Sequence, residues 1–149
     1  MLRLSKLADY AVVVLVRLSQ ADGCQTSPGI ASVTGLPEPT VAKVLKLLSG
    51  AGLVRSQRGA RGGYVLARPL TQIAVADVVA AIDGPIALAA CVEGGSGDCA
   101  SESLCPVRGR WDPVNHAVLQ ALTRITLADM TASTPRPRVV PVPSTIAAE

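Results

Sequence analysis

Aromatic side chains are nearly missing from this sequence of 149 residues, which contains no Phe, one Trp and two Tyr. Proteins that bind single-stranded nucleic acid stack the bases on aromatic side chains, so the chain is a poor match for that class. Its core must instead consist of Leu, Val, Ile and Ala packed between helices. Any nucleic-acid partner is therefore expected to be double-stranded.

Catalytic groups and long apolar runs are scarce as well. His116 is the only histidine, and we find neither a nucleophile motif nor a phosphate-binding loop, so we do not expect an enzyme. The run AVVVLV at residues 11–16 is too short to span a bilayer and lacks a signal-peptide cleavage site. We therefore expect a cytoplasmic protein without a membrane partner. A reducing cytoplasm favours metal or redox roles for clustered cysteines over structural disulfides.

The first half of the chain predicts a helix-turn-helix. Apolar residues recur at helical spacing over residues 4–18, and ADGC ends that helix. Ser27, followed by proline, is typical of a helix N-cap, and Gly35 ends a short helix that starts there. A second short helix begins in LPEPT, residues 36–40, and has an apolar stripe over residues 41–48. Two short helices joined around a glycine are typical of the motif.

Residues 53–67 then predict a β-hairpin. LVRSQ and YVLA have strand-forming composition, and RGARGG between them is a glycine-rich tip that carries Arg58 and Arg61. A hairpin directly after a helix-turn-helix is the element order of a winged helix. A further helix is expected over residues 73–84, where Gly84 ends it.

The sequence therefore predicts a mainly α fold: a winged helix-turn-helix with a β-hairpin wing and a long C-terminal dimerisation helix. We divide the chain into four parts. Residues 1–83 form the DNA-binding winged helix, and 84–110 form a cysteine-rich, cluster-binding loop. Residues 111–130 form one long amphipathic helix that packs on another subunit, and 131–149 form a Pro-rich, disordered tail.

Residues 1–83 hold nine Lys/Arg and five Asp/Glu, a balance that suits a polyanionic partner. A winged helix reads DNA with the second short helix in the major groove and with basic side chains of the wing on the backbone. Thr40 and Lys43 lie off the apolar stripe of that helix, and Arg58 and Arg61 lie at the wing tip. Ser27 adds an amide at a helix N-terminus for a phosphate. The alternative for each is solvated surface without contact to DNA.

Three of the four cysteines lie in the stretch CVEGGSGDCASESLC, as Cys91, Cys99 and Cys105. Thiolates on a glycine-rich loop are typical ligands of an iron–sulfur cluster. Zinc prefers pairs with the spacing C-x-x-C, whereas the gaps here are seven and five residues. A zinc site or a thiol redox switch remain alternatives. Cys24, far away in sequence, is expected to be an ordinary structural cysteine.

Several segments together resemble one family of bacterial regulators. They are RLSKLADYAV, GLVRSQRGARGGYVLARP, IAVADVVAAIDG, the cysteine triplet and ITLADM. On these segments, over about residues 1–130, the chain resembles the family of the iron–sulfur regulator IscR, the nitric-oxide sensor NsrR and the iron regulator RirA. CPVRGRW and ITLADM are most similar to the subgroup that regulates the SUF cluster-assembly operon.

The resemblance implies a homodimer held by the C-terminal helices and bound to a near-palindromic site on double-stranded DNA. It implies a cluster, 2Fe–2S or 4Fe–4S, on Cys91, Cys99 and Cys105, whose state sets DNA affinity. The function it implies is a transcriptional regulator, expected to be a repressor, that senses cluster status and controls SUF genes. A regulator of other genes that responds to nitric oxide or iron, or one that binds no cluster, is the alternative.

The resemblance leaves the fourth cluster ligand open. Where the IscR branch has a His three residues after the last cysteine, this chain has Arg108, which stays protonated and cannot bind iron. His116 lies about 12 Å farther along a helix and is expected on the surface or at the dimer face. Asp9 is similar to an acidic ligand that the NsrR branch supplies from the partner subunit, although the helix dipole also favours an acid there. A thiol, water or no ligand are the other possibilities.

Overall fold

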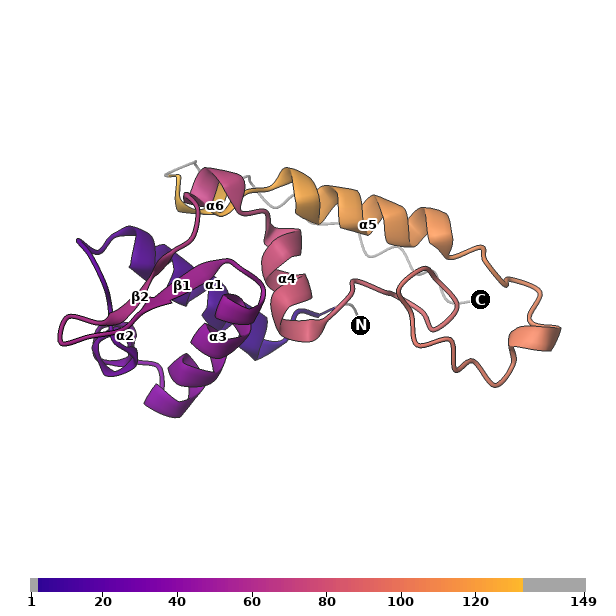
Figure 1. The fold of residues 1–149 in the computed structure, drawn as a ribbon. Coiled ribbons are helices and arrows are strands. Elements are labelled where there is room, and N and C mark those ends of the chain that lie inside the picture. The colour runs from indigo at the N-terminus through magenta and orange to yellow at the C-terminus, as the bar shows by residue number, and fades with distance from the viewer. Residues whose placement is uncertain (1–2, 133–149) are drawn as a thin grey trace, which may run out of the picture.

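A computed structural model describes residues 3–132 as a small helical body, with a β-hairpin at one end and a helix that leads to a long loop at the other (Figure 1). The fold class is mainly helical with one two-stranded antiparallel sheet, as predicted. In chain order the elements are α1 Lys6–Ser19, α2 Ser27–Thr34, α3 Glu38–Gly50, β1 Val54–Gln57, β2 Gly63–Leu66, α4 Val75–Asp83, α5 Asp112–Arg124 and α6 Leu127–Thr131. Short 3-10 turns lie at Leu70–Gln72 and Glu102–Leu104.

The core contains aliphatic side chains alone, as the composition predicts. Every buried hydrophobic residue in the described part of the chain is Ala, Val, Leu or Ile. Helices α1, α3 and α4 supply most of them, because each has apolar residues three and four positions apart on one face. Leu15 and Leu45 are both fully buried in this cluster.

Helices α2 and α3 form the predicted helix-turn-helix. Gly35 ends α2 with a φ of 71°, a left-handed conformation that glycine adopts without strain. The N-cap of α2 is Thr26 and not Ser27 as predicted, because the Thr26 backbone is extended and its hydroxyl oxygen accepts a hydrogen bond from the Gly29 amide. Ser27 is therefore the first residue of the helix.

The β-hairpin is joined to the segment after α1. Gln25 and Tyr64 form an antiparallel bridge in which each amide donates to the other's carbonyl, at 3.0 and 2.8 Å. The backbone at Gly63 lies so close to this segment that an added Cβ would stand 2.6 Å from the Gln25 carbonyl oxygen. Glycine is required there, and the base of the wing is fixed to the helical body.

The single helix predicted over residues 111–130 is two helices, α5 and α6. The helix breaks at Ile125 because its carbonyl accepts from the Val75 amide at 2.9 Å, and the Leu127 amide donates to Ile73 at 2.9 Å. These bonds tie the break to the start of α4, and they bury Leu127 completely in the core.

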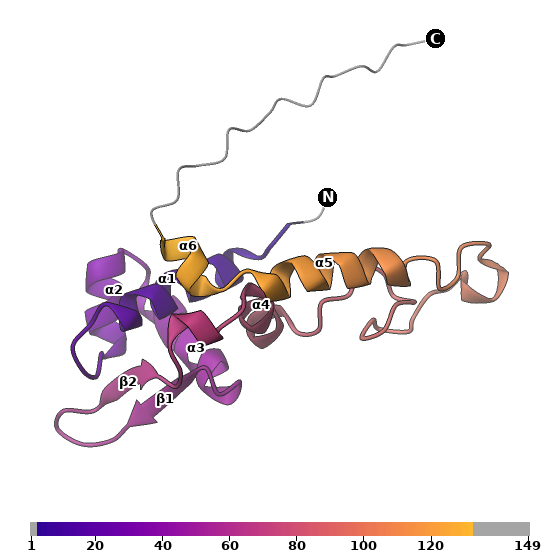
Figure 2. The ribbon, with the colours of Figure 1, turned by 90° about the horizontal axis from the view of Figure 1, so that it is seen from above.

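Figures 1 and 2 show α5 running from the helical body toward the long loop, which lies at its far end. The apolar stripe predicted for this helix is largely exposed in the single chain: Val114 is 44% exposed, Leu119 36% and Ile125 45%. Among residues 3–132, no helix combines the length and apolar character needed to cross a membrane. The predicted disordered tail lies outside the described residues, apart from Thr131 and Ala132.

Asp129 caps α6 and should make this end of the fold sensitive to acid. Its carboxylate accepts from the Thr126 amide at 2.8 Å and from the Thr126 hydroxyl at 2.7 Å. The backbone hydrogen bond first, and the hydroxyl second, hold the pKa of Asp129 below its usual value of 3.8. The cap therefore contributes stability above the unfolded pKa, and this contribution is lost as pH falls through the lower folded pKa.

We expect hydrogen-exchange protection of α6 to decrease as pH falls below about 4. In Asp129→Asn the protection should already be lower at neutral pH and should not depend on pH in this range. The measurement is amide exchange of residues 127–131, referenced at each pH to the unfolded chain. Identical pH profiles for the two proteins would contradict this role of Asp129.

Candidate DNA interface and cysteine loop

The candidate recognition helix α3 exposes polar side chains on the side away from the core. Val41 and Val44 are fully buried, whereas Lys43 is exposed and Thr40 is half-buried. The two predicted DNA-contacting residues therefore point away from the packed face. A helix of this kind can place Lys43 against phosphates or base edges in a major groove.

The wing tip presents two cations that have no carboxylate partner among residues 3–132. Arg58 and Arg61 are exposed in the turn between β1 and β2. The two ion pairs in the described part of the chain involve other residues, Arg68 with Asp77 and Arg108 with Glu102. Both wing guanidinium groups are thus available to an external anion.

Ser27 is the first residue of α2, and the environment of its side chain bears on its predicted role at a phosphate. Its hydroxyl oxygen is buried and has no hydrogen-bond partner within the described range 3–132. The helix N-terminus has free amide groups and a partial positive charge, which suits a phosphate. The structure places Ser27, Lys43 and Arg61 on three different elements: α2, α3 and the wing turn.

Cys24 has a contact that the sequence did not predict. Its thiol donates to the Gln57 side-chain oxygen at 2.8 Å, and Gln57 is the last residue of β1. Cys24 also adjoins Gln25, which pairs with the wing. The thiol is half-buried and lies at the junction of wing and helical body. No local pattern could reveal this contact, because the two residues are 33 positions apart.

Cys91 lies in a compact turn that is attached to α5. The Gly97 amide donates to the Ala90 carbonyl at 2.9 Å, which closes the turn around Cys91. An added Cβ at Gly95 would stand 2.6 Å from the Ala90 carbonyl oxygen, so the tight path requires glycine. The buried Asn115 side chain of α5 accepts from the Leu88 amide at 3.0 Å and anchors the start of this segment.

Cys99 and Cys105 lie farther along the same loop, on either side of the 3-10 turn at Glu102–Leu104. All three loop cysteines are free and half-buried. In the part of the chain that the structure describes, no three His, Cys, Asp or Glu side chains lie close enough to hold a metal ion. Three thiols fit a cluster by their chemistry, and in the described residues they do not gather around a single point.

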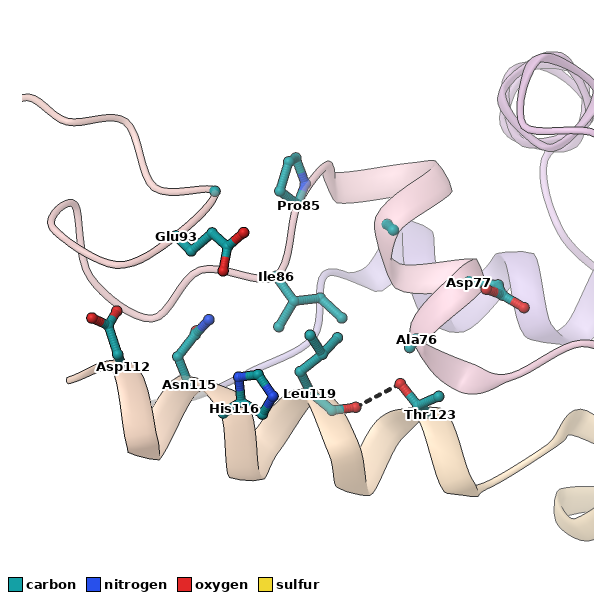
Figure 3. A pocket seen from close by; sticks show the side chains of 12 residues that line it. Ala76, Asp77, Pro85, Ile86, Glu93, Asp112, Asn115, His116, Leu119 and Thr123 are labelled. Atoms are coloured by element: carbon teal, nitrogen blue, oxygen red, sulfur yellow. Dashed lines mark hydrogen bonds between the residues drawn. The ribbon is translucent and has the colours of Figure 1, made fainter.

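The three other residues considered for the fourth ligand position lie on different elements: Asp9 on α1, His116 on α5 and Arg108 in the loop. Asp9 is exposed in the first turn of α1. His116 is exposed and lines a pocket of about 650 Å³ between α4, α5 and the loop, together with Glu93 and Asp112 and with no cysteine (Figure 3). Arg108 pairs with Glu102. His116 thus lies on the surface, one of the two places predicted for it.

Comparison with known proteins identifies the family. Residues 4–133 match the family model Rrf2, described as an iron-dependent transcriptional regulator. The chain belongs to the Rrf2 family. A Mycobacterium tuberculosis relative in this family, Rv1287, is named as an HTH-type transcriptional regulator. It is 36% identical over 132 residues, which cover 87% of this chain and 81% of the relative.

Two solved Rrf2-type structures are similar over most of the chain. CymR, the global cysteine regulator of B. subtilis, is 29% identical with a TM-score of 0.68, covering 91% of this chain and all of that one. IscR of T. potens is 33% identical with a TM-score of 0.62, covering 87% of this chain and 85% of that one. The chain is therefore a winged-helix, DNA-binding transcriptional regulator of the Rrf2 family, with likeness to both IscR and CymR.

Proposed function

We propose that this Rrf2-family protein is a cytoplasmic repressor whose affinity for its operator depends on an iron–sulfur cluster bound at Cys91, Cys99 and Cys105. The observation that carries the proposal is the presence of three free thiols in one loop at the far end of α5 from the wing. The similarity to IscR supports the cluster, and the CPVRGRW and ITLADM segments support SUF genes as the target.

Two copies of the chain are proposed to bind a near-palindromic site as a homodimer. The exposed apolar residues of α5, among them Val114 and Ile125, supply a surface that a second copy would cover. Each copy would then present Thr40 and Lys43 to a major groove, with Arg58 and Arg61 on the adjacent backbone and Ser27 at a phosphate.

A cluster, 2Fe–2S or 4Fe–4S, would be held by thiolates of the three loop cysteines, and Asp9 of a second copy is the proposed fourth ligand. A bound cluster would supply iron and a redox centre that responds to cluster supply, which thiols alone do not provide. Binding would gather the three thiols at one place in the loop. Because Asn115 ties this loop to α5, a change in the loop can alter how α5 packs in the dimer and hence the spacing of the two recognition helices.

A second candidate function is regulation without a cluster. It is favoured by the separation of the three thiols and by the similarity to CymR, the global cysteine regulator of B. subtilis. In that case the cysteines would act as a thiol switch or a zinc site. A regulator that controls other genes in response to nitric oxide or iron would use the same DNA interface and the same cysteine loop.

The experiment is a comparison of DNA affinity in two states of one preparation. An operator fragment is first selected from genomic DNA with the wild-type protein. The dissociation constant is then measured anaerobically after reconstitution with iron and sulfide, and again after chelator treatment. We expect the two constants to differ between about 5- and 150-fold.

Cys105→Ala should remove this difference, and Cys24→Ala is the matched control that should retain it. Equal affinities of the two states of the wild-type protein would favour the second candidate function. A difference that survives in Cys105→Ala would contradict the assignment of Cys105 as a ligand.

A further inference from the structure

Residues 99–108 of the cysteine loop form a series of linked turns. The Glu102 amide donates to the Cys99 carbonyl at 3.1 Å, the Cys105 amide to Glu102 at 3.4 Å, and the Arg108 amide to Cys105 at 3.3 Å. Each bond joins residues three positions apart. The Cys105 backbone is extended, with φ −77° and ψ 117°, so the last of these turns does not continue the 3-10 turn at Glu102–Leu104.

An ion pair joins the turn before Cys105 to the turn after it. Arg108 Nη2 lies 2.8 Å from Glu102 Oε1. Glu102 stands three positions before Cys105, and Arg108 stands three positions after it. The side chains are 34% exposed for Glu102 and 63% exposed for Arg108. The nearby Arg110 is exposed and belongs to neither ion pair of residues 3–132.

We propose that Glu102 and Arg108 are positioning residues for Cys105. The pair holds the turns on the two sides of Cys105 together and keeps this residue half-buried. Arg108 thus has a role at the cysteine site without being a ligand. A role of this ion pair in cluster binding rests on the proposed function. The positioning of Cys105 is a property of the metal-free chain and can be tested there.

The test is the rate at which iodoacetamide, a neutral reagent, alkylates each cysteine of the reduced, metal-free protein, followed by peptide mass spectrometry. An exposed ion pair has a modest effect on a local equilibrium, so we expect changes of about two- to fivefold. Glu102→Gln and Arg108→Gln should each accelerate alkylation of Cys105 by this factor. Cys24 should be unaffected, and the exchange of the two charges, Glu102→Arg with Arg108→Glu, should restore the slow rate.

The design separates positioning from a simple charge effect. The thiolate is the reactive form, so loss of a negative neighbour would accelerate alkylation and loss of a positive neighbour would slow it. Opposite directions for Glu102→Gln and Arg108→Gln would therefore overturn the proposal. Equal rates in all variants, or a failure of the charge exchange to restore the wild-type rate, would also overturn it. Arg110→Gln is the control for loss of a nearby positive charge, and it should leave the rate unchanged.

The alkylation experiment and the cluster measurement can fail independently of each other. If the alkylation rates follow the prediction while no preparation takes up iron and sulfide, the positioning role stands and the cluster is wrong. If the wild-type chain binds a cluster but the rates do not respond, the cluster stands and the ion pair has no positioning role.

Discussion

Replacing both Arg58 and Arg61 by Ala should weaken binding to duplex DNA by about 10- to 100-fold near 0.15 M salt. Both guanidinium groups are exposed at the wing tip and neither is engaged by a carboxylate in the described structure. Each contact to a phosphate releases about one counterion, so the slope of log K against log salt should fall by about 2. The measurement is fluorescence anisotropy with a selected operator over a series of salt concentrations.

The loss should be similar on the operator and on an unrelated duplex, because phosphate contacts do not read sequence. Arg110→Ala with Arg124→Ala is the matched control, because it removes the same charge from exposed positions outside the winged helix. If the control lowers affinity and slope as much as the wing variant does, net charge and not the wing accounts for binding. An unchanged slope in the wing variant would show that these residues do not contact phosphates.

Leu45→Ala should destabilise the fold by about 2–5 kcal/mol. Leu45 is fully buried in α3, where it belongs to the cluster formed by α1, α3 and α4. Its truncation removes apolar contacts and leaves a cavity that close-packed neighbours cannot fill. The measurement is urea unfolding followed by circular dichroism at one fixed protein concentration, because dimerisation would add a concentration-dependent term.

Lys46→Ala provides the comparison, since Lys46 is the next residue of α3 and is exposed. It should change the free energy of unfolding by less than about 0.5 kcal/mol. Similar losses for the two variants would contradict the assignment of Leu45 to the core.

Periodicity predicted most of the helical body because its elements bury one face each. The spacing of Val41, Val44, Leu45 and Leu48 places all four on one side of a helix, and all four are fully buried. The wing could be predicted for a similar reason, since two strand-forming segments flank a glycine-rich turn. Ser27 shows the limit of such rules. Threonine and serine both cap helices, and only the backbone conformation decides that Thr26 is the cap.

The break between α5 and α6 could not be predicted from periodicity. Apolar residues continue at helical spacing from Val114 through Ile125 and no proline or glycine follows before Met130, so the sequence favours one helix. The break depends on backbone bonds to Ile73 and Val75, which are distant in sequence. Long-range pairing of this kind overrides local propensity.

The candidate site was predictable only as a set of residue types. The three loop cysteines are conspicuous in the sequence, and the family resemblance assigns them a purpose. Their separation in the structure is set by the local turns at Ala90–Gly97 and Cys99–Arg108, which spacing does not reveal. The contacts of Cys24 with Gln57 and of Glu102 with Arg108 depend on side-chain placement, so they emerge only with coordinates.

The most direct test of the central claim is the visible absorption spectrum of protein purified without oxygen, with iron and sulfide counted on the same sample. The proposed cluster predicts absorption between about 320 and 450 nm and matching amounts of iron and sulfide. Cys105→Ala should lose both, whereas Cys24→Ala should keep them. A colourless wild-type protein, even after reconstitution with iron and sulfide, would contradict the cluster and leave a DNA-binding regulator with a thiol or zinc site.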